Sequence, residues 1–265
     1  LHQMNQRPEN QGPADLYYNE ENAELYAQSG RMNEIQTQLT DRALDLLEIE
    51  DNGLLLLDIG CGTGISTNFL NEQGFLAIGV DISVPMLNQN QTDHLVRLDI
   101  GEGLPFQPGT FDGAISISVL QWLCYSNSKA ENPFKRLFDF FTSLFGCLKP
   151  GAKAVFQFYP EHEHQLQLIM DASQKAGFGG RLQVDFPNSS KAKKMYLVLQ
   201  CGLTAIVGKD KKAHNDKIKR FSNNRIHDKS HREKILEKKA KLSRLGEDVR
   251  APGKYTGNKR HGMFK

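Results

Sequence analysis

The sequence predicts an α/β fold in which a mostly parallel, seven-stranded sheet carries helices on both faces. Two observations support this prediction. Short apolar segments alternate with helix-like segments from residue 54 to residue 201, and such alternation is typical of parallel sheets covered on both sides. In addition, the first apolar segment, LLLLDI, leads directly into the glycine-rich stretch GCGTG. A glycine-rich turn between a strand and a helix usually brings the backbone close to a ligand.

Apolar runs and turn residues define the expected elements in chain order. The polar residues 1–16 are expected to form a loop, and a helical pattern over residues 17–48 breaks near Ser29 and Gly30. We expect strands over residues 54–59, 75–80, 94–98, 111–117, 152–158, 182–186 and 195–201. We expect helices over residues 64–73, 85–90, 133–148 and 166–176, with Pro150 and Gly151 ending the third of them.

Charge divides the 265-residue chain into two parts. Residues 204–265 hold 19 of the 33 Lys and Arg residues but only 7 of the 31 Asp and Glu residues, a net charge of +12, whereas residues 1–203 carry −10. Apolar residues are also sparse after Lys209. We therefore expect one folded domain over residues 17–203 and a basic, largely disordered tail over residues 204–265, whose charge suits a polyanionic partner.

Cysteine spacing and hydropathy limit the class of protein. The four cysteines, Cys61, Cys124, Cys147 and Cys201, form no CxxC pair, which argues against a disulfide framework and against a cysteine zinc site. We expect no bound metal and a reducing compartment. The sequence shows no signal peptide and no run of 18 apolar residues, so we expect no membrane association.

The glycine-rich stretch discriminates between nucleotide-binding motifs. Gly60, Gly62 and Gly64 form G-x-G-x-G, whereas the dinucleotide fingerprint G-x-G-x-x-G requires a glycine where Ile65 stands. A Walker loop requires a lysine that is also missing here. With Asp58 in front, the pattern D-x-G-x-G-x-G is that of the S-adenosylmethionine loop of Rossmann-like class I methyltransferases. The alternative interpretation is an ordinary helix-capping turn.

Two carboxylates favour the cofactor interpretation over the capping turn. Asp81 ends the second expected strand, 21 residues after Gly60, where a carboxylate can accept hydrogen bonds from both ribose hydroxyls. Asp99 ends the third expected strand and can accept a hydrogen bond from the adenine amino group. Ile82 and Ile100 follow these carboxylates directly and are expected to contact the cofactor as well. All of these residues lie at the carboxyl ends of strands, where open α/β sheets bind their ligands.

Several longer segments carry a family resemblance. They are RPENQGPADLYYNEENAELYAQSGRMNEIQTQLTDRALDLL (7–47), LLLLDIGCGTGIS, GVDIS, FDGAISISVLQWLCYS (111–126), VFQFYPE (155–161) and KYTGNKR (254–260). Together they resemble the eukaryotic 18S rRNA (guanine-N7) methyltransferases, which act in biogenesis of the small ribosomal subunit. The resemblance is nearly continuous over residues 7–202 and returns in the tail. Asn258 departs from it, because a basic residue is expected there.

The resemblance implies a cofactor, a substrate and a partner. The cofactor is S-adenosyl-L-methionine, the substrate is 18S rRNA in the pre-40S particle, and the location is the nucleus or nucleolus, with the cytoplasm as an alternative. The partner is a small zinc-binding activator subunit that extends the sheet at the strand over residues 94–98. Tyr26 and Arg31 belong to an N-terminal segment that covers the cofactor in this family, and Ser116 completes the expected cofactor contacts.

Trp122 and Tyr159 are the residues expected to position the target base. Each follows an expected strand, Trp122 the fourth and Tyr159 the fifth, although core packing and a chain turn are the ordinary alternatives. No general base is expected, because guanine N7 carries a lone pair and no proton. Two other functions stay open: methylation of a small molecule, and a structural role in pre-ribosome assembly that outweighs catalysis.

Overall fold

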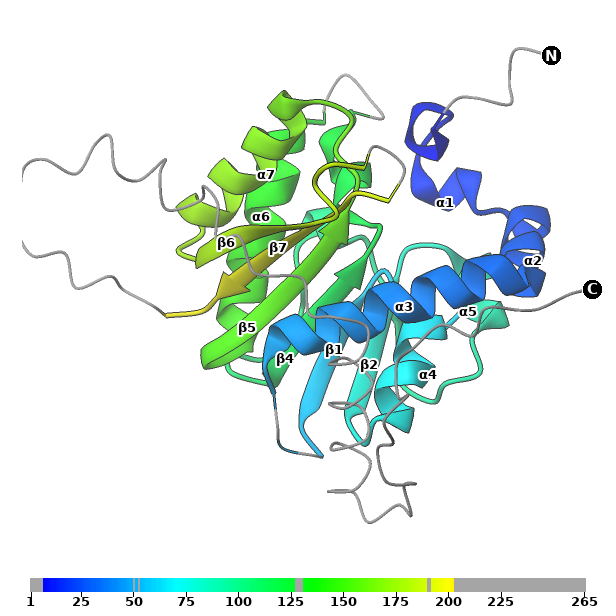
Figure 1. Ribbon diagram of the computed structural model, residues 1–265, viewed down its shortest axis with the longest axis horizontal. Helices are drawn as coiled ribbons and strands as arrows, with labels where there is room; N and C mark the ends of the chain where they lie inside the picture. The colour runs from blue at the N-terminus through cyan, green and yellow to red at the C-terminus, as the bar shows by residue number, and fades with distance from the viewer. Residues whose placement is uncertain (1–6, 50, 52, 127–130, 190–191, 203–265) are drawn as a thin grey trace, which may run out of the picture. The chain divides into compact units, whose positions relative to one another are not determined.

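The computed structural model describes residues 7–49, 51, 53–126, 131–189 and 192–202 of the chain, and these residues form an α/β domain (Figure 1). The basic tail expected over residues 204–265 lies outside the described residues. Within the described part, the expected mostly parallel sheet of seven strands is confirmed. No helix there combines the length and the apolar character that a membrane span requires.

The seven strands form one sheet in the order β3-β2-β1-β4-β5-β7-β6. The first five strands in the chain run parallel to one another, and β7 runs antiparallel to both β5 and β6. The strands are β1 (Leu55–Ile59), β2 (Leu76–Asp81), β3 (Leu95–Arg97), β4 (Phe111–Ile117), β5 (Leu148–Phe158), β6 (Gly179–Asp185) and β7 (Lys194–Gln200). The leucine-rich β1 is an interior strand between β2 and β4, and its side chains are buried on both faces of the sheet.

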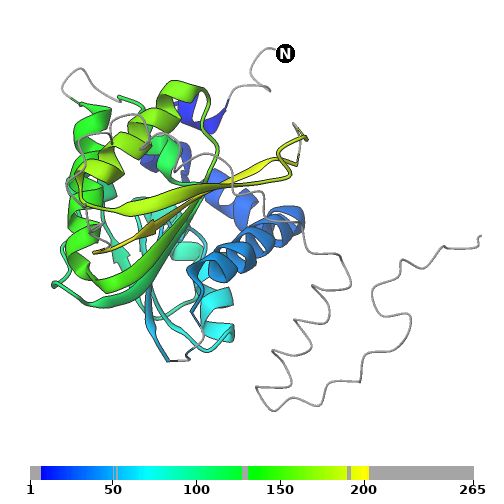
Figure 2. The ribbon, with the colours of Figure 1, turned by 60° about the vertical axis from the view of Figure 1, so that its left-hand side comes forward.

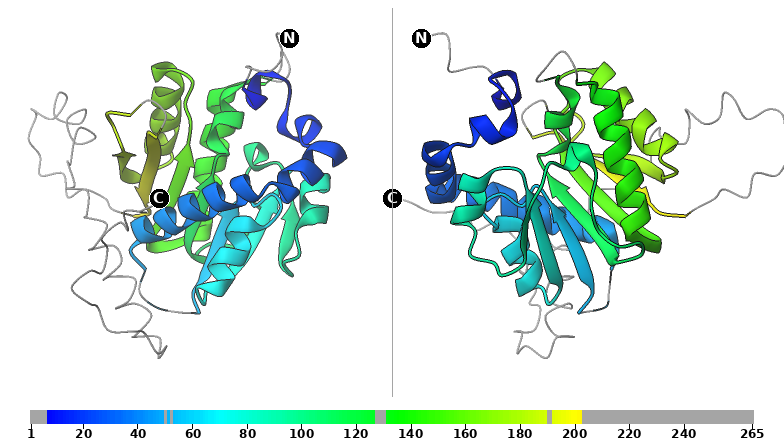
Figure 3. Two further views of the ribbon diagram at one scale, coloured as in Figure 1. Left: turned by 45° about the vertical axis from the view of Figure 1, so that its right-hand side comes forward. Right: turned by 180° about the vertical axis from the view of Figure 1, so that it is seen from behind.

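Helices cover both faces of this sheet (Figure 3). The helices are α1 (Ala14–Tyr17), α2 (Glu20–Gln28), α3 (Gly30–Leu47), α4 (Ile65–Glu72), α5 (Val84–Gln89), α6 (Pro133–Cys147) and α7 (Glu163–Lys175). Short 3-10 turns are η2 (Pro8–Asn10), η3 (Ile100–Glu102) and η4 (Leu120–Cys124). The expected break near Ser29 is confirmed, because the Ser29 hydroxyl accepts a hydrogen bond from the Met32 amide and caps α3.

The domain has one apolar core on each side of the sheet. On one side, α3 packs its buried leucines, such as Leu39 and Leu47, against Phe75 and Tyr196. On the other side, Phe140 and Phe141 of α6 contact Phe156 of β5 edge to face. The sheet is therefore held from both faces, and its carboxyl edge is left to the loops that build the functional site.

Several expected boundaries differ from the structure by one to four residues. Residues 1–16 were expected to be loop, but the described residues of this segment form η2 and begin α1. The helix expected over residues 133–148 ends at Cys147, and β5, expected from residue 152, starts at Leu148 because this buried leucine pairs directly with Phe111. The pairing then shifts, and Gly151 adopts a φ of 83° that lets the strand continue past the irregularity.

Candidate functional site

A cavity of about 340 Å³ opens at the carboxyl edge of the parallel strands. This is the edge at which open α/β sheets bind ligands, and the volume lies in the range of small-molecule sites. Eight of the predicted site residues line it. Four come from the ends of β1 and β2 and the loops after them: Gly60, Gly62, Asp81 and Ile82. The other four come from three further segments: Tyr26 from α2, Asp99 and Ile100 after β3, and Trp122 from η4.

The glycine-rich loop adopts a backbone that only glycine accommodates easily. Gly60, Gly62 and Gly64 have φ values of 73°, 52° and 88°. The loop is tied to β2, because the amides of Gly60 and Cys61 both donate to the carbonyl of Val80, at 2.8 and 3.0 Å. A Cβ atom on Gly60 would lie 2.1 Å from Val119 Cγ2. The loop is therefore closely packed as well as conformationally constrained.

Asn90 supports the same loop and was not predicted from the sequence. Its side-chain amide donates to the carbonyl of Gly62 at 3.3 Å, and its oxygen accepts from the amide and hydroxyl of Thr92 at 3.0 and 2.8 Å. A Cβ atom on Gly64 would lie 2.3 Å from this oxygen. Gly64 does not line the cavity, and both its φ of 88° and its close packing on Asn90 require glycine at this position.

Asp81 is held by backbone amides from two loops. Its two carboxylate oxygens accept from the amides of Gly62 and Ser83, at 2.9 and 2.8 Å. Burial raises the pKa of Asp81, and these amide hydrogen bonds act against the rise. Each oxygen accepts one protein hydrogen bond and has a second lone pair, so the carboxylate can still bind a pair of ligand hydroxyls.

Asp99, which follows the neighbouring strand β3, also lines the cavity and forms an ion pair with Arg136. One terminal guanidinium nitrogen of Arg136 lies 2.8 and 2.9 Å from the two Asp99 oxygens, and the other lies 3.3 Å from Glu131. The Gly101 amide also donates to Asp99, at 2.9 Å. Arg136 lines the cavity but was missed in the sequence, because it comes from α6, 37 residues further along the chain.

Asp58 does not line the cavity, contrary to the expectation that it binds the cofactor. It is 1% exposed, and one of its oxygens accepts from the hydroxyls of Ser66 and Thr67, both at 2.6 Å. The other oxygen is buried with no hydrogen-bond partner. Burial raises the pKa of Asp58 to about 6. Asp58 therefore anchors the start of α4 beneath the loop.

The N-terminal segment covers the cavity through aromatic side chains. Tyr18 and Tyr26 both line it, their rings lie 6.1 Å apart in an edge-to-face arrangement, and burial raises the pKa of each phenol. The Ser83 hydroxyl donates to the Tyr18 carbonyl at 2.8 Å and fixes the segment above β2. Arg31, in contrast, is exposed on α3 and does not line the cavity.

The two residues expected to position the base lie in different surroundings. Trp122 lines the cavity and contacts the rings of Tyr17 and Tyr18, at centroid distances of 5.8 and 5.6 Å. Tyr159 lies outside the cavity lining. Its hydroxyl accepts from the Lys194 ammonium group at 2.7 Å, and its carbonyl accepts from Arg7 at 2.8 Å.

Ser118 is a strained residue at the end of β4 that the sequence did not indicate. It lines the cavity with a φ of 63°, which is unusual for a residue other than glycine. Its amide and hydroxyl both donate to Gln157, at 2.8 and 2.9 Å, and its carbonyl accepts from Gln121 at 2.9 Å. The neighbouring Ser116 is fully buried and donates to the carbonyl of Ile59, so it does not reach the cavity.

The residues that line the cavity fit S-adenosylmethionine in the hydrogen-bonding groups that they supply. The glycine cradle admits backbone contact with a ligand, and Asp81 and Asp99 supply acceptors at separate positions. The hydroxyl of Thr63 lines the cavity and is buried with no protein partner, as expected of a group that a ligand completes. Among the described residues, no group of three or more His, Cys, Asp or Glu side chains is placed to hold a metal ion.

Two family models match separate parts of the chain. One, described as "Methyltransferase domain", matches residues 57–156, which include the glycine-rich loop, both acceptor carboxylates and Trp122. The other, described as "Methyltransferase involved in Williams-Beuren syndrome", matches residues 202–262.

Curated relatives resemble the chain over nearly its full length. The 18S rRNA (guanine-N(7))-methyltransferase of Mus musculus is 43% identical over an alignment of 275 positions that covers 97% of this chain and 98% of that protein. The 18S rRNA (guanine(1575)-N(7))-methyltransferase of Saccharomyces cerevisiae is 38% identical over 97% of this chain and 99% of that protein.

Solved structures of low sequence identity share the fold. One is a methyltransferase of Haloferax volcanii, solved in complex with the Trm112 methyltransferase activator. It has a TM-score of 0.51 and 19% identity, and covers 68% of this chain and 97% of that one. Another is a putative S-adenosyl-L-methionine-dependent methyltransferase of Methanococcus maripaludis, with a TM-score of 0.54 and 12% identity over 71% and 96%.

Proposed function

The chain belongs to the 18S rRNA (guanine-N7)-methyltransferase family, and from this premise we propose how its cavity serves methyl transfer from S-adenosylmethionine to guanine N7 in 18S rRNA. The observation that carries the proposal is the glycine cradle of residues 60–64, whose Gly62 amide donates to the Asp81 carboxylate, so that loop and carboxylate line one cavity together. The substrate is inferred from the family, whose curated members match 97% of the chain. The binding place of the cofactor is inferred from the cavity.

The cofactor is proposed to lie along the ends of β1, β2 and β3. Asp81 accepts hydrogen bonds from the ribose hydroxyls with the lone pairs that Gly62 and Ser83 leave free. Asp99 accepts from the adenine amino group, and the hydrogen bonds from Arg136 hold that carboxylate in a fixed orientation. When bound, the cofactor supplies an electrophilic methyl group on a sulfonium centre. Tyr18 and Tyr26 exclude water above it.

Guanine N7 needs no general base, because its in-plane lone pair is already free to attack and no proton leaves afterwards. The chain then contributes by orienting the base and excluding water. Trp122 is the side chain best placed for this role, since it lines the cavity next to Ser118 and Tyr18. Tyr159 is proposed to guide the base from the neighbouring strand end, with its ring direction fixed by Lys194.

Replacing Asp81 with alanine should weaken cofactor binding and abolish most guanine methylation. Two ribose hydroxyls lose their acceptor, and the amides of Gly62 and Ser83 lose theirs, so the loss in binding free energy should be about 1–3 kcal/mol. Calorimetry with S-adenosylhomocysteine measures the affinity. Chemical cleavage at N7-methylguanosine in 18S rRNA measures the product, with the wild-type chain and its activator as reference.

Arg31→Ala is the matched control for this experiment, since Arg31 is exposed and does not line the cavity. Its affinity should equal that of the wild type. Unchanged cofactor affinity in Asp81→Ala would remove Asp81 from the site. Wild-type chain that binds cofactor but leaves guanine N7 unmodified in intact pre-40S particles would overturn the proposed substrate.

The activator subunit is proposed to bind at β3. This strand is at the edge of the sheet, and within the described residues it pairs only with β2. The His94 carbonyl and the Leu98 amide bond to β2, so the backbone groups of Leu95 and Arg97 point outward by the alternation of a strand. Such an edge accepts an added strand, and the H. volcanii methyltransferase of the same fold was solved with an activator of this kind.

Arg97→Pro should prevent the heterodimer from forming. Proline removes the outward N–H and leaves the bonds to β2 in place, so the added strand loses a hydrogen bond and meets a bulky ring. Arg97→Ala, which keeps the N–H, should retain the partner. Co-purification of the small zinc-binding activator with each variant measures the effect. Equal yields with Arg97→Pro and Arg97→Ala would place the partner elsewhere.

The two parts of the chain are proposed to have different functions, methyl transfer and rRNA binding. Residues 17–203 form the methyltransferase domain, and residues 204–265 form a tail whose net charge of +12 adds affinity for rRNA. The match of the second family model over residues 202–262 supports treating this tail as a unit. Action on precursors of the small ribosomal subunit implies a nuclear or nucleolar location.

A further inference from the structure

The hairpin of β6 and β7 brings an exposed phenylalanine to the carboxyl edge of the sheet. Phe186 follows the last residue of β6 and is 51% exposed. Its φ of 53° is a left-handed conformation that costs free energy for a bulky residue. Figure 2 shows this hairpin, in yellow-green and yellow, projecting from the body of the domain. A single exposed apolar side chain is ordinary, so its surroundings decide whether it has a role.

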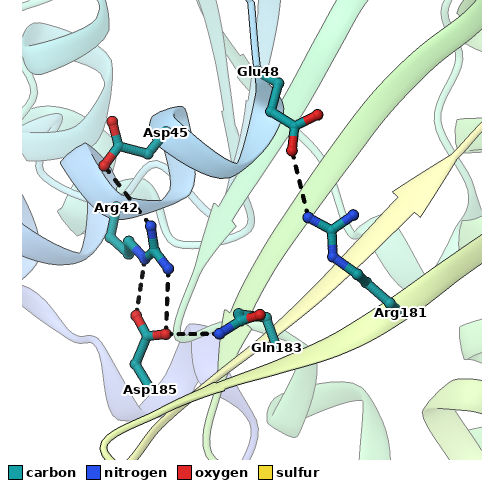
Figure 4. A network of polar contacts seen from close by, with 6 residues as sticks. All are labelled: Arg42, Asp45, Glu48, Arg181, Gln183 and Asp185. Atoms are coloured by element: carbon teal, nitrogen blue, oxygen red, sulfur yellow. Dashed lines mark hydrogen bonds and ion pairs between the residues drawn. The ribbon is translucent and has the colours of Figure 1, made fainter. Parts of the chain in front are cut away.

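A polar network holds the hairpin at the end of β6, next to its turn (Figure 4). Arg42 of α3 donates to both oxygens of Asp185, at 2.9 and 3.3 Å, and Gln183 donates to the same carboxylate at 3.0 Å. Asp185 immediately precedes Phe186. The aromatic ring is therefore presented by a fixed backbone, and little conformational entropy is lost when it contacts a ligand.

Two lysines lie across the hairpin from Phe186. Lys194 pairs with Asp185 in the strand register, and its ammonium group donates to the Tyr159 hydroxyl at 2.7 Å. Lys193 is exposed. In the part of the chain that the structure describes, neither lysine forms an ion pair with a carboxylate. Their positive charges are therefore available to an anionic partner.

The order of the strands lines these groups up with the site. From the cavity outward, the carboxyl edge presents Ser118 after β4, Tyr159 after β5, Lys194 at β7 and Phe186 after β6. Neighbouring strands lie about 5 Å apart, so this row spans about 15 Å. Aromatic rings interleaved with unpaired cations are the usual surface for single-stranded nucleic acid, in which bases stack and phosphates pair with the cations.

We propose that the β6–β7 hairpin is a docking surface for the single-stranded rRNA that flanks the target guanosine. A neighbouring base stacks on Phe186, and Lys193 and Lys194 contact the phosphates between that base and the guanosine in the cavity. This inference rests on the proposed rRNA substrate. It assigns RNA binding within the folded domain to the β6–β7 hairpin, a surface distinct from the basic tail and from the glycine loop that binds the cofactor.

Phe186→Ala should raise the KM for rRNA by about 5- to 100-fold, the usual loss when one stacked base is released, and leave cofactor affinity unchanged. Phe186→Tyr, which keeps a stacking face, should behave as the wild type. Leu76→Ala is the matched control, because Leu76 is 57% exposed at the start of β2, at the amino ends of the parallel strands and away from the cavity. The assay is methylation by the full chain with its activator.

Phe186→Gly separates binding from stability. Glycine adopts the positive φ without strain, so the Tm should stay at or above the wild-type value while the KM for rRNA rises as in Phe186→Ala. If Phe186→Ala and Phe186→Gly both keep the wild-type KM while the wild type methylates guanine N7, the hairpin proposal is wrong and the proposed function stands. A wild type that methylates no rRNA overturns the function itself.

The salt dependence of binding tests the lysines. Removing one lysine that neutralises a phosphate of a single strand should lower the slope of log K against log salt concentration by about 0.7. We expect this change for Lys193→Met. Lys149→Met removes the same charge at the start of β5, at the amino ends of the parallel strands, and should leave the slope unchanged. Equal slopes for Lys193→Met and the wild type would overturn the pairing of Lys193 with phosphate.

Discussion

Replacing Gly60 with alanine is expected to abolish measurable binding of S-adenosylhomocysteine and to lower the free energy of unfolding by about 2–4 kcal/mol. Two effects combine. Alanine is strained at the Gly60 φ of 73°, which costs about 1–2 kcal/mol, and its Cβ would lie 2.1 Å from Val119 Cγ2. Val119 lines the cavity, so relief of the clash moves both the loop and the wall that faces the cofactor. Calorimetry and urea unfolding measure the two losses.

Gly109→Ala is a close control for this variant. Gly109 has a similar φ of 65°, but no heavy atom lies within 4 Å of the position where its Cβ would stand. Its loss of stability should equal the backbone strain alone, with normal cofactor affinity. Adding Val119→Ala to Gly60→Ala should restore part of the stability, because the clashing methyl group is removed. Equal losses in the Gly60 and Gly109 variants would show that packing on Val119 is unimportant.

The buried carboxyl of Asp58 should make the domain less stable as the pH rises from about 4 to above 6. Burial raises the pKa of Asp58 from 3.8 in the unfolded chain to about 6 in the folded one, so the folded state holds this proton more tightly. The resulting stabilisation is fully present below the unfolded pKa and is lost as the pH rises through the folded pKa. The shift corresponds to about 3 kcal/mol.

Asp58→Asn isolates this effect, since asparagine keeps one oxygen for the hydroxyls of Ser66 and Thr67 but does not titrate. The wild type should lose about 3 kcal/mol relative to Asp58→Asn between pH 4 and pH 7.5. Urea unfolding at several pH values, followed by the fluorescence of Trp122, the single tryptophan, measures the difference. A difference that stays constant with pH would show that Asp58 is ionised throughout.

The sequence could predict the features that depend on local spacing. The D-x-G-x-G-x-G loop begins at the end of β1, and Asp81 ends β2. Because these two strands are parallel neighbours, the loop and Asp81 lie at the same edge of the sheet. The seven strands were predictable for a similar reason, since their buried residues are nearly all apolar. The departures occur where one pairing changes a boundary, as at Leu148, which joins β5 as soon as α6 ends.

The remaining site residues depend on contacts between distant parts of the chain. Arg136 reaches Asp99 across 37 residues, and Asn90 reaches Gly62 across 28. Neither stands in a motif that signals a ligand. Asp58 shows the converse difficulty, because its place in the motif suggested cofactor contact, whereas its side chain is directed into the start of α4. Sequence pattern locates a loop, but only packing decides which atoms face the cavity.

A thiol lies in the loop that cradles the cofactor, and its burial has a chemical consequence. Cys61 lines the cavity but is only 4% exposed, and burial raises its pKa. Because oxidants and alkylating agents react with the thiolate, Cys61 should stay reduced under mild oxidative stress. Burial also raises the pKa of Cys124, Cys147 and Cys201, so we expect all four thiols of the methyltransferase domain to oxidise slowly at neutral pH.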